Sequence, residues 1–80
     1  MAPNGHPPPE PGMTPAHIGR IVRAARKSQG LRQDQLAGAA GVGVRFLSEL
    51  EGGKTTVQLG KALRVLRALG CSVRIVPPDR

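Results

Sequence analysis

The chain of 80 residues contains no tryptophan or tyrosine, one phenylalanine (Phe46) and one cysteine (Cys71). A single cysteine excludes an internal disulfide and is compatible with a reducing cytoplasm. Proteins that bind RNA or single-stranded DNA usually stack bases on exposed aromatic side chains, so this composition argues against that class. No segment approaches the roughly 20 apolar residues of a membrane span, and no signal peptide is recognisable at the start. We therefore expect a soluble protein that is not secreted and has no membrane partner.

Acidic residues are also scarce, with five Asp and Glu against twelve Lys and Arg and a formal net charge of +7. A strongly basic chain favours a polyanionic partner, and the lack of stacking aromatics makes duplex DNA the favoured one. The alternative is a basic surface that serves only solubility. The chain is long enough for one domain, and its small core predicts that association with a second copy completes the burial.

The opening stretch, MAPNGHPPPEPGMTP, holds six of the eight prolines and shows no apolar periodicity. This composition predicts a disordered or polyproline-like tail over residues 1–13. Met13 directly precedes the first helical pattern, which suggests the hypothesis that the chain starts at Met13 rather than at Met1.

Residues 14–70 show apolar positions at helical spacing, interrupted by glycines. Thr14 and Pro15 are typical of an N-cap and a first helical position, and Gly30 is typical of a helix end. We predict four helices, over residues 15–29, 33–40 and 44–51, and from a threonine cap at Thr55 or Thr56 to Leu69.

The segment CSVRIVPP places Cys71, Val73 and Ile75 on one face of a short strand over residues 71–76. The chain offers no second strand to satisfy its backbone groups, so the partner strand should come from another copy. The apolar stripe of the fourth helix is also too wide for one small core. These features predict an all-α domain followed by a dimerisation strand.

The stretch QDQLAGAAGVGVRFLSELEGGK predicts two short helices joined by a tight turn. Ala37 suits the point where the helices cross, because a larger side chain would push them apart. Gly41 suits a turn residue with positive φ. A second helix presented outward in this way is a rod that fits a major groove about 12 Å wide.

The chain resembles the Cro/C1-type (XRE) helix-turn-helix family at Gln33, Ala37, Gly41, Leu47 and Leu50, and the match extends over nearly all of residues 17–70. This resemblance implies a lambda-repressor-like fold of four to five helices. It also implies a structural ion pair between Arg26 and Glu51.

Two positions depart from that family pattern. Arg32 stands where a capping Ser or Thr is common, and Gly43 stands where the next helix often has Ser. Arg32 gives up a cap worth about 1 kcal/mol, while Gly43 is a milder loss.

Residues 46–70, FLSELEGGKTTVQLGKALRVLRALG, followed by the predicted strand, are similar to HipB-like antitoxins of bacterial toxin–antitoxin operons. Members of that group are homodimers that repress their own operon and bind a toxin, often a HipA-type kinase. Their C-terminal strands pair across the dimer. The resemblance therefore implies a dimer interface formed by Val65, Leu69, Val73 and Ile75.

By position in the family pattern, the start of the helix over residues 44–51 should meet base edges through Val44, Arg45 and Glu49. Arg45 is the candidate for a bidentate guanine contact and Val44 for a thymine methyl. Glu49 either accepts a hydrogen bond from cytosine or orients Arg45. We expect contacts to DNA phosphates from Gln33, Arg32, Arg23, Ser48 and Lys54. Any one of these side chains alone could instead be a plain surface residue.

No pattern predicts catalysis, a metal site or a cofactor. His6 and His17 lack ligand-spaced partners, and the acidic residues form no enclosed pair. The expected function is a sequence-specific repressor of the bacterial cytoplasm and nucleoid, acting as the antitoxin of a type II toxin–antitoxin operon. The alternatives are a stand-alone regulator without a toxin, and a protein-interaction module that no longer binds DNA.

Overall fold

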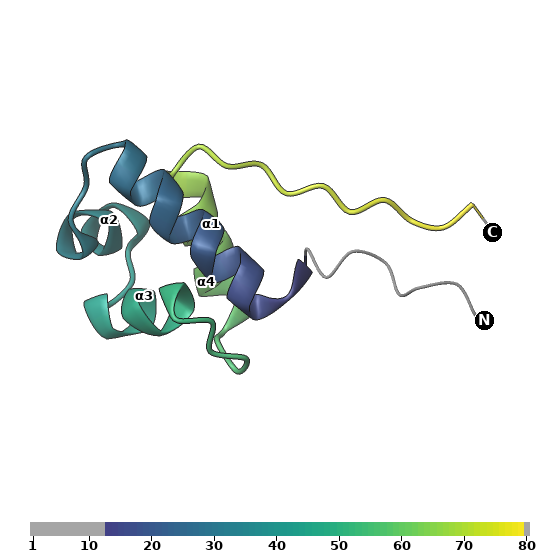
Figure 1. Ribbon diagram of the computed structural model, residues 1–80, viewed down its shortest axis with the longest axis horizontal. Helices are drawn as coiled ribbons and strands as arrows, with labels where there is room; N and C mark the ends of the chain where they lie inside the picture. The colour runs from purple at the N-terminus through teal and green to yellow at the C-terminus, as the bar shows by residue number, and fades with distance from the viewer. Residues whose placement is uncertain (1–12, 80) are drawn as a thin grey trace.

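The computed structural model describes residues 13–79, which form four α-helices and no β-strand (Figure 1). The helices are α1 (Pro15–Ser28), α2 (Gln33–Ala40), α3 (Val44–Glu51) and α4 (Leu59–Ala68). The predicted all-α class is confirmed, with four helices of the expected four to five. Apart from Met13 itself, the predicted tail and the choice of starting methionine lie outside the described residues.

The first helix begins and ends within one residue of the prediction. Thr14 caps it, because the Thr14 hydroxyl accepts a hydrogen bond of 3.1 Å from the His17 amide, and Pro15 fills the first helical position. Gly30 follows the helix with φ of +70°, which is a conformation that ends helices. The local sequence therefore determines both ends of α1.

The turn between α2 and α3 has the predicted construction. Gly41 ends α2 in the left-handed region with φ of +71°, and the Val42 amide donates to the Ala37 carbonyl at 3.0 Å. Ala37 is almost fully buried in the core. Since such interiors are close-packed, a larger side chain at Ala37 would push α2 away from its neighbours.

The start of α4 is a correction to the prediction. The helix begins at Leu59, and Thr55 and Thr56 lie in a turn rather than at the cap. Gln58 takes the capping role, because its side-chain oxygen accepts a hydrogen bond of 2.8 Å from the Lys61 amide. Residues 52–58 connect the end of α3 to the start of α4. Thr55 and Thr56 lie inside this connection, before the helix begins, so neither can cap it.

The core lies between the four helices. α1 packs chiefly against α3, and α2 packs against both α3 and α4. Each helix contributes one large side chain that is fully buried, namely Val22, Leu36, Leu47 and Val65. Because no helix is dispensable to this cluster, the position of α3 depends on all the others.

Gly19 marks the closest approach of α1 to α3. A Cβ atom at Gly19 would lie 2.5 Å from the carbonyl oxygen of Leu50 and 2.7 Å from that of Glu51. These are backbone atoms, which cannot turn aside as a flexible side chain can. Sequence reasoning missed this residue, although a glycine inside a helix costs stability and so requires a packing reason.

Residues 71–79 leave the helices without forming a strand, which corrects the prediction for residues 71–76. A strand requires a neighbouring ladder, and none of the other described residues provides one. The segment extends away from α2 and α3, as Figure 1 shows at the end marked C. The side-chain nitrogen of Gln29 donates a hydrogen bond of 2.8 Å to the Leu69 carbonyl, and this contact holds the point at which the segment leaves α4.

The structure also corrects two members of the predicted dimer interface. Val65 and Leu69 are buried by the chain itself and are not available to a second copy. The large apolar side chains that α4 leaves exposed are Leu59, at 70%, and Leu63. The wide stripe of α4 thus has an inner part, which fills the core, and an outer part, which is free.

Candidate nucleic-acid interface

The start of α3 carries the side chains that were predicted to meet base edges. Val44 and Arg45 occupy its first two positions, and the Arg45 side chain is 92% exposed. Ser48 is also exposed, one turn further along. A helix whose first turn projects such side chains into solvent can enter a groove without rearrangement of the core.

Glu49 lies between two basic side chains, Arg45 on the same helix and Lys54 in the turn that follows it. Its carboxylate is 3.6 Å from the Arg45 Nε atom and 3.3 Å from the Lys54 Nζ atom. The Lys54 amide also donates to the Glu49 carbonyl at 3.0 Å. Of the two roles open for Glu49, the contact with Arg45 is therefore the one that the free chain displays.

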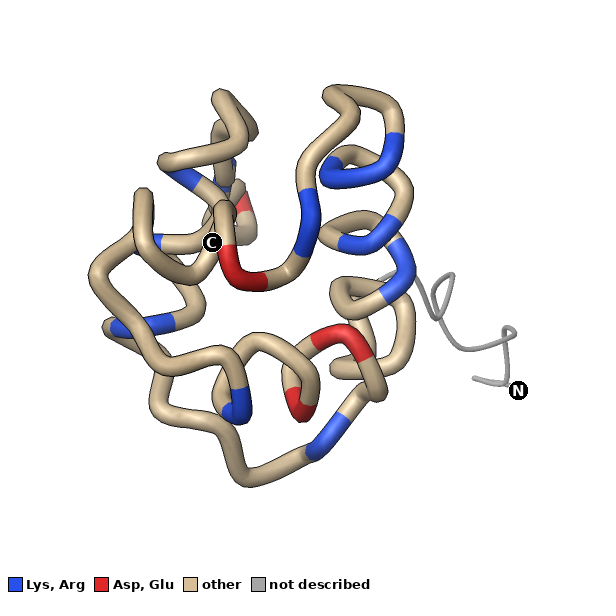
Figure 2. Tube along the Cα trace, turned by 90° about the vertical axis from the view of Figure 1, so that its left-hand side faces the viewer, with Lys and Arg blue, Asp and Glu red and all other residues tan. Residues whose placement is uncertain are grey.

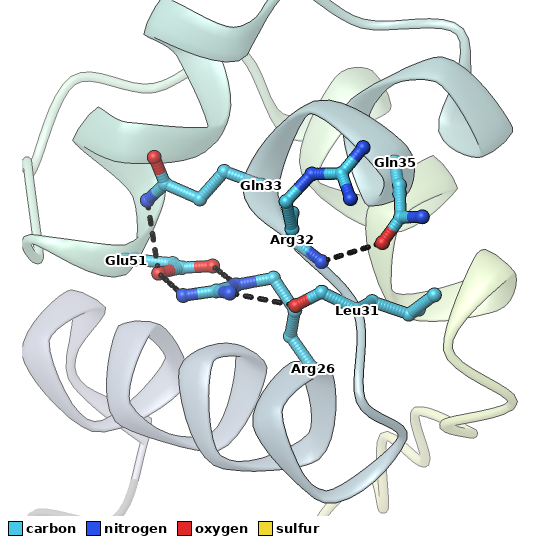
Figure 3. Close-up of polar contacts among 6 residues, drawn as sticks. All are labelled: Arg26, Leu31, Arg32, Gln33, Gln35 and Glu51. Atoms are coloured by element: carbon cyan, nitrogen blue, oxygen red, sulfur yellow. Dashed lines mark hydrogen bonds and ion pairs between the residues drawn. The ribbon is translucent and has the colours of Figure 1, made fainter.

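The far end of α3 is held by a bidentate ion pair. Arg26 on α1 donates from Nε and Nη2 to the two carboxylate oxygens of Glu51, at 2.7 and 3.0 Å (Figure 3). Arg26 also donates from Nη1 to the Leu31 carbonyl at 2.8 Å. The side chains of Arg26 and Glu51 are only 11% and 5% exposed, so water screens this pair weakly. The guanidinium thus joins α1, the following loop and the end of α3.

Burial alone would raise the pKa of Glu51, because it disfavours the charged carboxylate. Hydrogen bonds from Arg26 and Gln33, together with the positive charges of Arg26 and Arg23, outweigh burial and hold that pKa below its ordinary value. The hydrogen bond to Glu51 in turn raises the pKa of Arg26. Both groups therefore stay charged over the physiological range.

Gln33 and Arg32, two predicted phosphate contacts, lie at the start of α2. The Gln33 side-chain nitrogen donates to a Glu51 oxygen at 3.1 Å, which links the start of α2 to the end of α3 (Figure 3). Arg32 is exposed and its Nε atom lies 3.0 Å from a carboxylate oxygen of Asp34. Both side chains thus have partners within the chain, and binding a phosphate would compete with those partners.

Helix α2 recovers part of the cap that Arg32 cannot supply. The Gln35 side-chain oxygen accepts a hydrogen bond of 2.8 Å from the Arg32 amide. This contact is one half of a capping box, in which the third helical residue reaches back to the cap. Sequence reasoning missed Gln35, although a glutamine at that position is the signal that could have found it.

Basic side chains surround these elements. Arg23 is exposed on α1, and its charge reaches Glu51, so it lies on the side of α1 that faces the end of α3. In Figure 2 the Lys and Arg positions are spread around the molecule, whereas the few acidic positions lie nearer the middle of the view. Basic positions are therefore distributed over the whole helical domain rather than gathered at one place in this view.

Two comparisons with known proteins agree with this geometry. The chain matches the helix-turn-helix family over residues 22–76 and belongs to that family. It is also 62% identical over 65 residues to a protein of Sinorhizobium fredii named as the uncharacterized HTH-type transcriptional regulator y4mF. The matched stretch covers 81% of this chain and 86% of the relative. None of the described helices has the length and apolarity needed to cross a membrane.

Proposed function

We propose that this protein is a transcriptional regulator that binds duplex DNA sequence-specifically, with α3 in the major groove. The observation that carries the proposal is Arg45, which stands almost fully exposed at the start of the helix that the turn presents outward. Membership of the helix-turn-helix family and the name of the Sinorhizobium fredii relative support it. The protein acts by occupying DNA in the cytoplasm and nucleoid, without catalysis or a cofactor.

In this proposal the first turn of α3 reads bases. The Arg45 guanidinium offers two parallel N–H donors that match O6 and N7 of guanine. Val44 is exposed beside it and contacts a thymine methyl group. In the free chain Glu49 holds Arg45 near this position, with 3.6 Å between its carboxylate and the Arg45 Nε atom.

Phosphate contacts fix the orientation of α3 in the groove. Lys54 follows α3, and the charge of Arg23 acts on Glu51, so both cations lie toward the C-terminal end of the recognition helix. The remaining candidates are Ser48, Arg32 and Gln33. Such contacts add affinity for every sequence and make binding depend on salt, but they carry no base preference.

The test separates these two roles. Duplexes selected from a random pool by the wild-type chain define the preferred sequence, and binding is then measured to that sequence and to unselected DNA. Arg45→Ala should lower specific affinity by about 1–3 kcal/mol and relax the preference at one base pair. Arg23→Ala and Lys54→Ala should weaken binding to all sequences alike and flatten the salt dependence. Unchanged affinity and preference in Arg45→Ala would contradict the proposal that Arg45 reads a base.

We further propose that the protein represses as a homodimer. The large apolar residues that remain exposed gather mainly on one face, formed by α1, α4 and the C-terminal segment, and they line a shallow groove there. This dimer face comprises Met13, Ile21, Leu59, Leu63 and Val73. Ile75, at 88% exposed, lies beyond it on the same segment. A second copy would cover the face, and antiparallel pairing of the two C-terminal segments would satisfy their backbone groups.

Sedimentation tests the dimer. Removal of residues 71–80 should give a monomer that binds one half-site weakly, because dimerisation sets the spacing of two recognition helices. Leu59→Asp and Leu63→Asp should also give monomers, since both residues are exposed and neither fills the core. Val44→Ser removes an exposed apolar residue outside the dimer face and should leave the dimer intact. A truncated chain that remains dimeric at micromolar concentration would rule out the C-terminal seam.

The finer proposal is that the protein is the antitoxin of a type II operon and neutralises a HipA-like toxin. It rests on the resemblance of residues 46–70 to HipB-like antitoxins. The alternative is a stand-alone regulator without a toxin partner, and the relative named as an HTH-type transcriptional regulator is compatible with either. Expression of the adjacent gene alone and together with this one decides between them. Toxicity that co-expression relieves supports the antitoxin, and a harmless neighbour supports the stand-alone regulator.

A further inference from the structure

Glu49 places one carboxylate against two of the cations that the proposed function assigns to DNA. Its oxygens lie 3.6 Å from Arg45 Nε and 3.3 Å from Lys54 Nζ. The Arg45 and Lys54 side chains are 92% and 48% exposed, whereas Glu49 is 33% exposed. The two cations can therefore swing away from the carboxylate more easily than the carboxylate can follow them.

The backbone keeps Lys54 within reach of Glu49. The Lys54 amide donates to the Glu49 carbonyl at 3.0 Å, directly after Gly53, whose φ is +84°. A Cβ atom at Gly53 would lie 2.9 Å from the Cα atom of Ala16, so the start of α1 confines this turn. The turn thus returns Lys54 to the outer side of α3.

Glu49 differs from the other acidic residues of the helical domain. Glu51 is turned toward Arg26 and buried, and Asp34 pairs with Arg32 at the start of α2. Glu49 is thus the acidic side chain of α3 that stands with the proposed base-reading residues. A carboxylate at this place repels the DNA phosphates and so lowers affinity for DNA. A functional role for Glu49 would offset this loss of affinity.

We infer that Glu49 is a specificity-determining residue, which restrains Arg45 and Lys54 in the free protein and disfavours DNA that offers it no hydrogen-bond donor. This inference rests on the proposed function. When Lys54 moves to a phosphate and Arg45 to a guanine, Glu49 loses both partners and faces the groove. The amino group of cytosine or adenine replaces them, whereas base oxygens and ring nitrogens repel the carboxylate. The residue therefore lowers affinity where the base that it faces is guanine or thymine and spares adenine or cytosine at that place.

The variant Glu49→Gln tests this, because it keeps the size of the side chain and removes its charge. Binding is measured to an unselected duplex and to the duplex selected by the wild-type chain, over a range of salt. We expect affinity for the unselected duplex to rise about threefold or more, and the salt slope to steepen by about one unit. Affinity for the selected duplex should rise less or fall, so that the ratio between the two duplexes drops.

A matched control removes the effect of net charge. Asp79→Asn changes the total charge equally, but Asp79 lies in the C-terminal segment, away from α3. It should leave the ratio between the two duplexes unchanged. In a Lys54→Gln background, Glu49→Gln should give a smaller gain on unselected DNA, because one of the restrained cations is already absent.

The outcomes separate this inference from the proposed function. A wild-type chain that binds selected and unselected duplexes equally, or binds neither, overturns the proposed function and this inference with it. A wild-type chain that discriminates, with a Glu49→Gln variant that discriminates equally well, overturns only the role of Glu49. A gain in Asp79→Asn as large as that in Glu49→Gln also overturns it, since net charge would then explain both.

Discussion

Two glutamates on the same helix, Glu49 and Glu51, show how burial separates holding a fold from contacting a ligand. The Glu51 side chain is 5% exposed and accepts two hydrogen bonds from Arg26, at 2.7 and 3.0 Å. Glu49 is 33% exposed and lies at the longer distances of 3.3 and 3.6 Å from its two cations. Breaking the first pair leaves the buried Glu51 charge with only the hydrogen bond from Gln33, while breaking the second returns both ions to solvent.

Helix α3 thus has an anchored end, at Glu51, and a free side, at Glu49. At the anchored end, Arg26, Gln33 and the close contact at Gly19 hold the backbone. On the free side, the ion pairs are weak enough to exchange for contacts with DNA. Recognition requires both properties, since a side chain can discriminate between bases only if the helix that carries it is fixed.

The largest expected effect comes from breaking the anchored pair. Arg26→Ala should lower the free energy of unfolding by about 3–5 kcal/mol, because it leaves the Glu51 charge buried and unpaired. Urea denaturation of the wild type and the variant at neutral pH measures this loss. A loss well below 1 kcal/mol is typical of an exposed pair and would contradict the burial described for Glu51.

A second change attacks the same end of α3 through its packing. Gly19→Ala should cost about 1–3 kcal/mol, because the new methyl group would overlap the Leu50 and Glu51 carbonyl oxygens. Gly38→Ala is the matched control, since Gly38 lies in α2 with open space where its Cβ would be. Gly38→Ala should raise the free energy of unfolding by about 0.4–1 kcal/mol, because alanine leaves the unfolded chain fewer conformations than glycine does. Equal effects of the two substitutions would show that contact with α3 is not the cause.

Acid should weaken the anchored end. Because the pKa of Glu51 in the folded chain lies below its ordinary value of 4.5, the ion pair contributes its full stability above that pH. This contribution is lost as the pH falls through the lower, folded pKa. Melting temperatures measured from neutral to acidic pH should therefore decline in this range. The variant Asp34→Asn should show most of the same decline in melting temperature, since Asp34 is exposed. If the decline disappeared in that variant, the pair of Arg32 and Asp34 would be its cause instead.

The smallest expected effect completes the contrast. Glu49→Gln should change the free energy of unfolding by less than about 0.5 kcal/mol, because the side chain it alters is partly solvated and loosely paired. Thermal melts of the variant beside those of Arg26→Ala give the comparison directly. A loss of 2 kcal/mol or more would mean that both glutamates hold the fold.

Local sequence predicted the helical part of this structure well. The bounds of α2 and α3, the cap at Thr14 and the left-handed turn at Gly41 all depend on residues close together in the chain. The start of α4 was placed too early because threonine is the stronger capping residue, whereas the path from α3 leaves that role to Gln58. Capping propensity thus favoured the wrong residue type, and the path of the chain between α3 and α4 decided both the residue and its position.

Packing between distant segments was harder to predict. Periodicity showed that α4 has a wide apolar stripe, but it could not show that Val65 faces the core and Leu59 faces outward. The predicted strand depended on a partner that a single chain does not contain. The close approach at Gly19 is likewise set by the fold, whereas the pair of Arg45 and Glu49 is a local contact within α3. The candidate base-reading residues came from family resemblance, and their exposure came from the structure.

The ring of Phe46 lies at the junction of α3 and α4, half-buried, with the Lys61 Nζ atom 5.8 Å from its centre. Since the chain has no tryptophan or tyrosine, it is almost silent in near-ultraviolet spectroscopy. Phe46→Trp would therefore introduce a single fluorophore next to the recognition helix, on an otherwise dark background. An indole face attracts a cation more strongly than that of phenylalanine, so the contact with Lys61 should be kept. Because the ring is half-buried between α3 and α4, its emission would report the separation of these helices on unfolding.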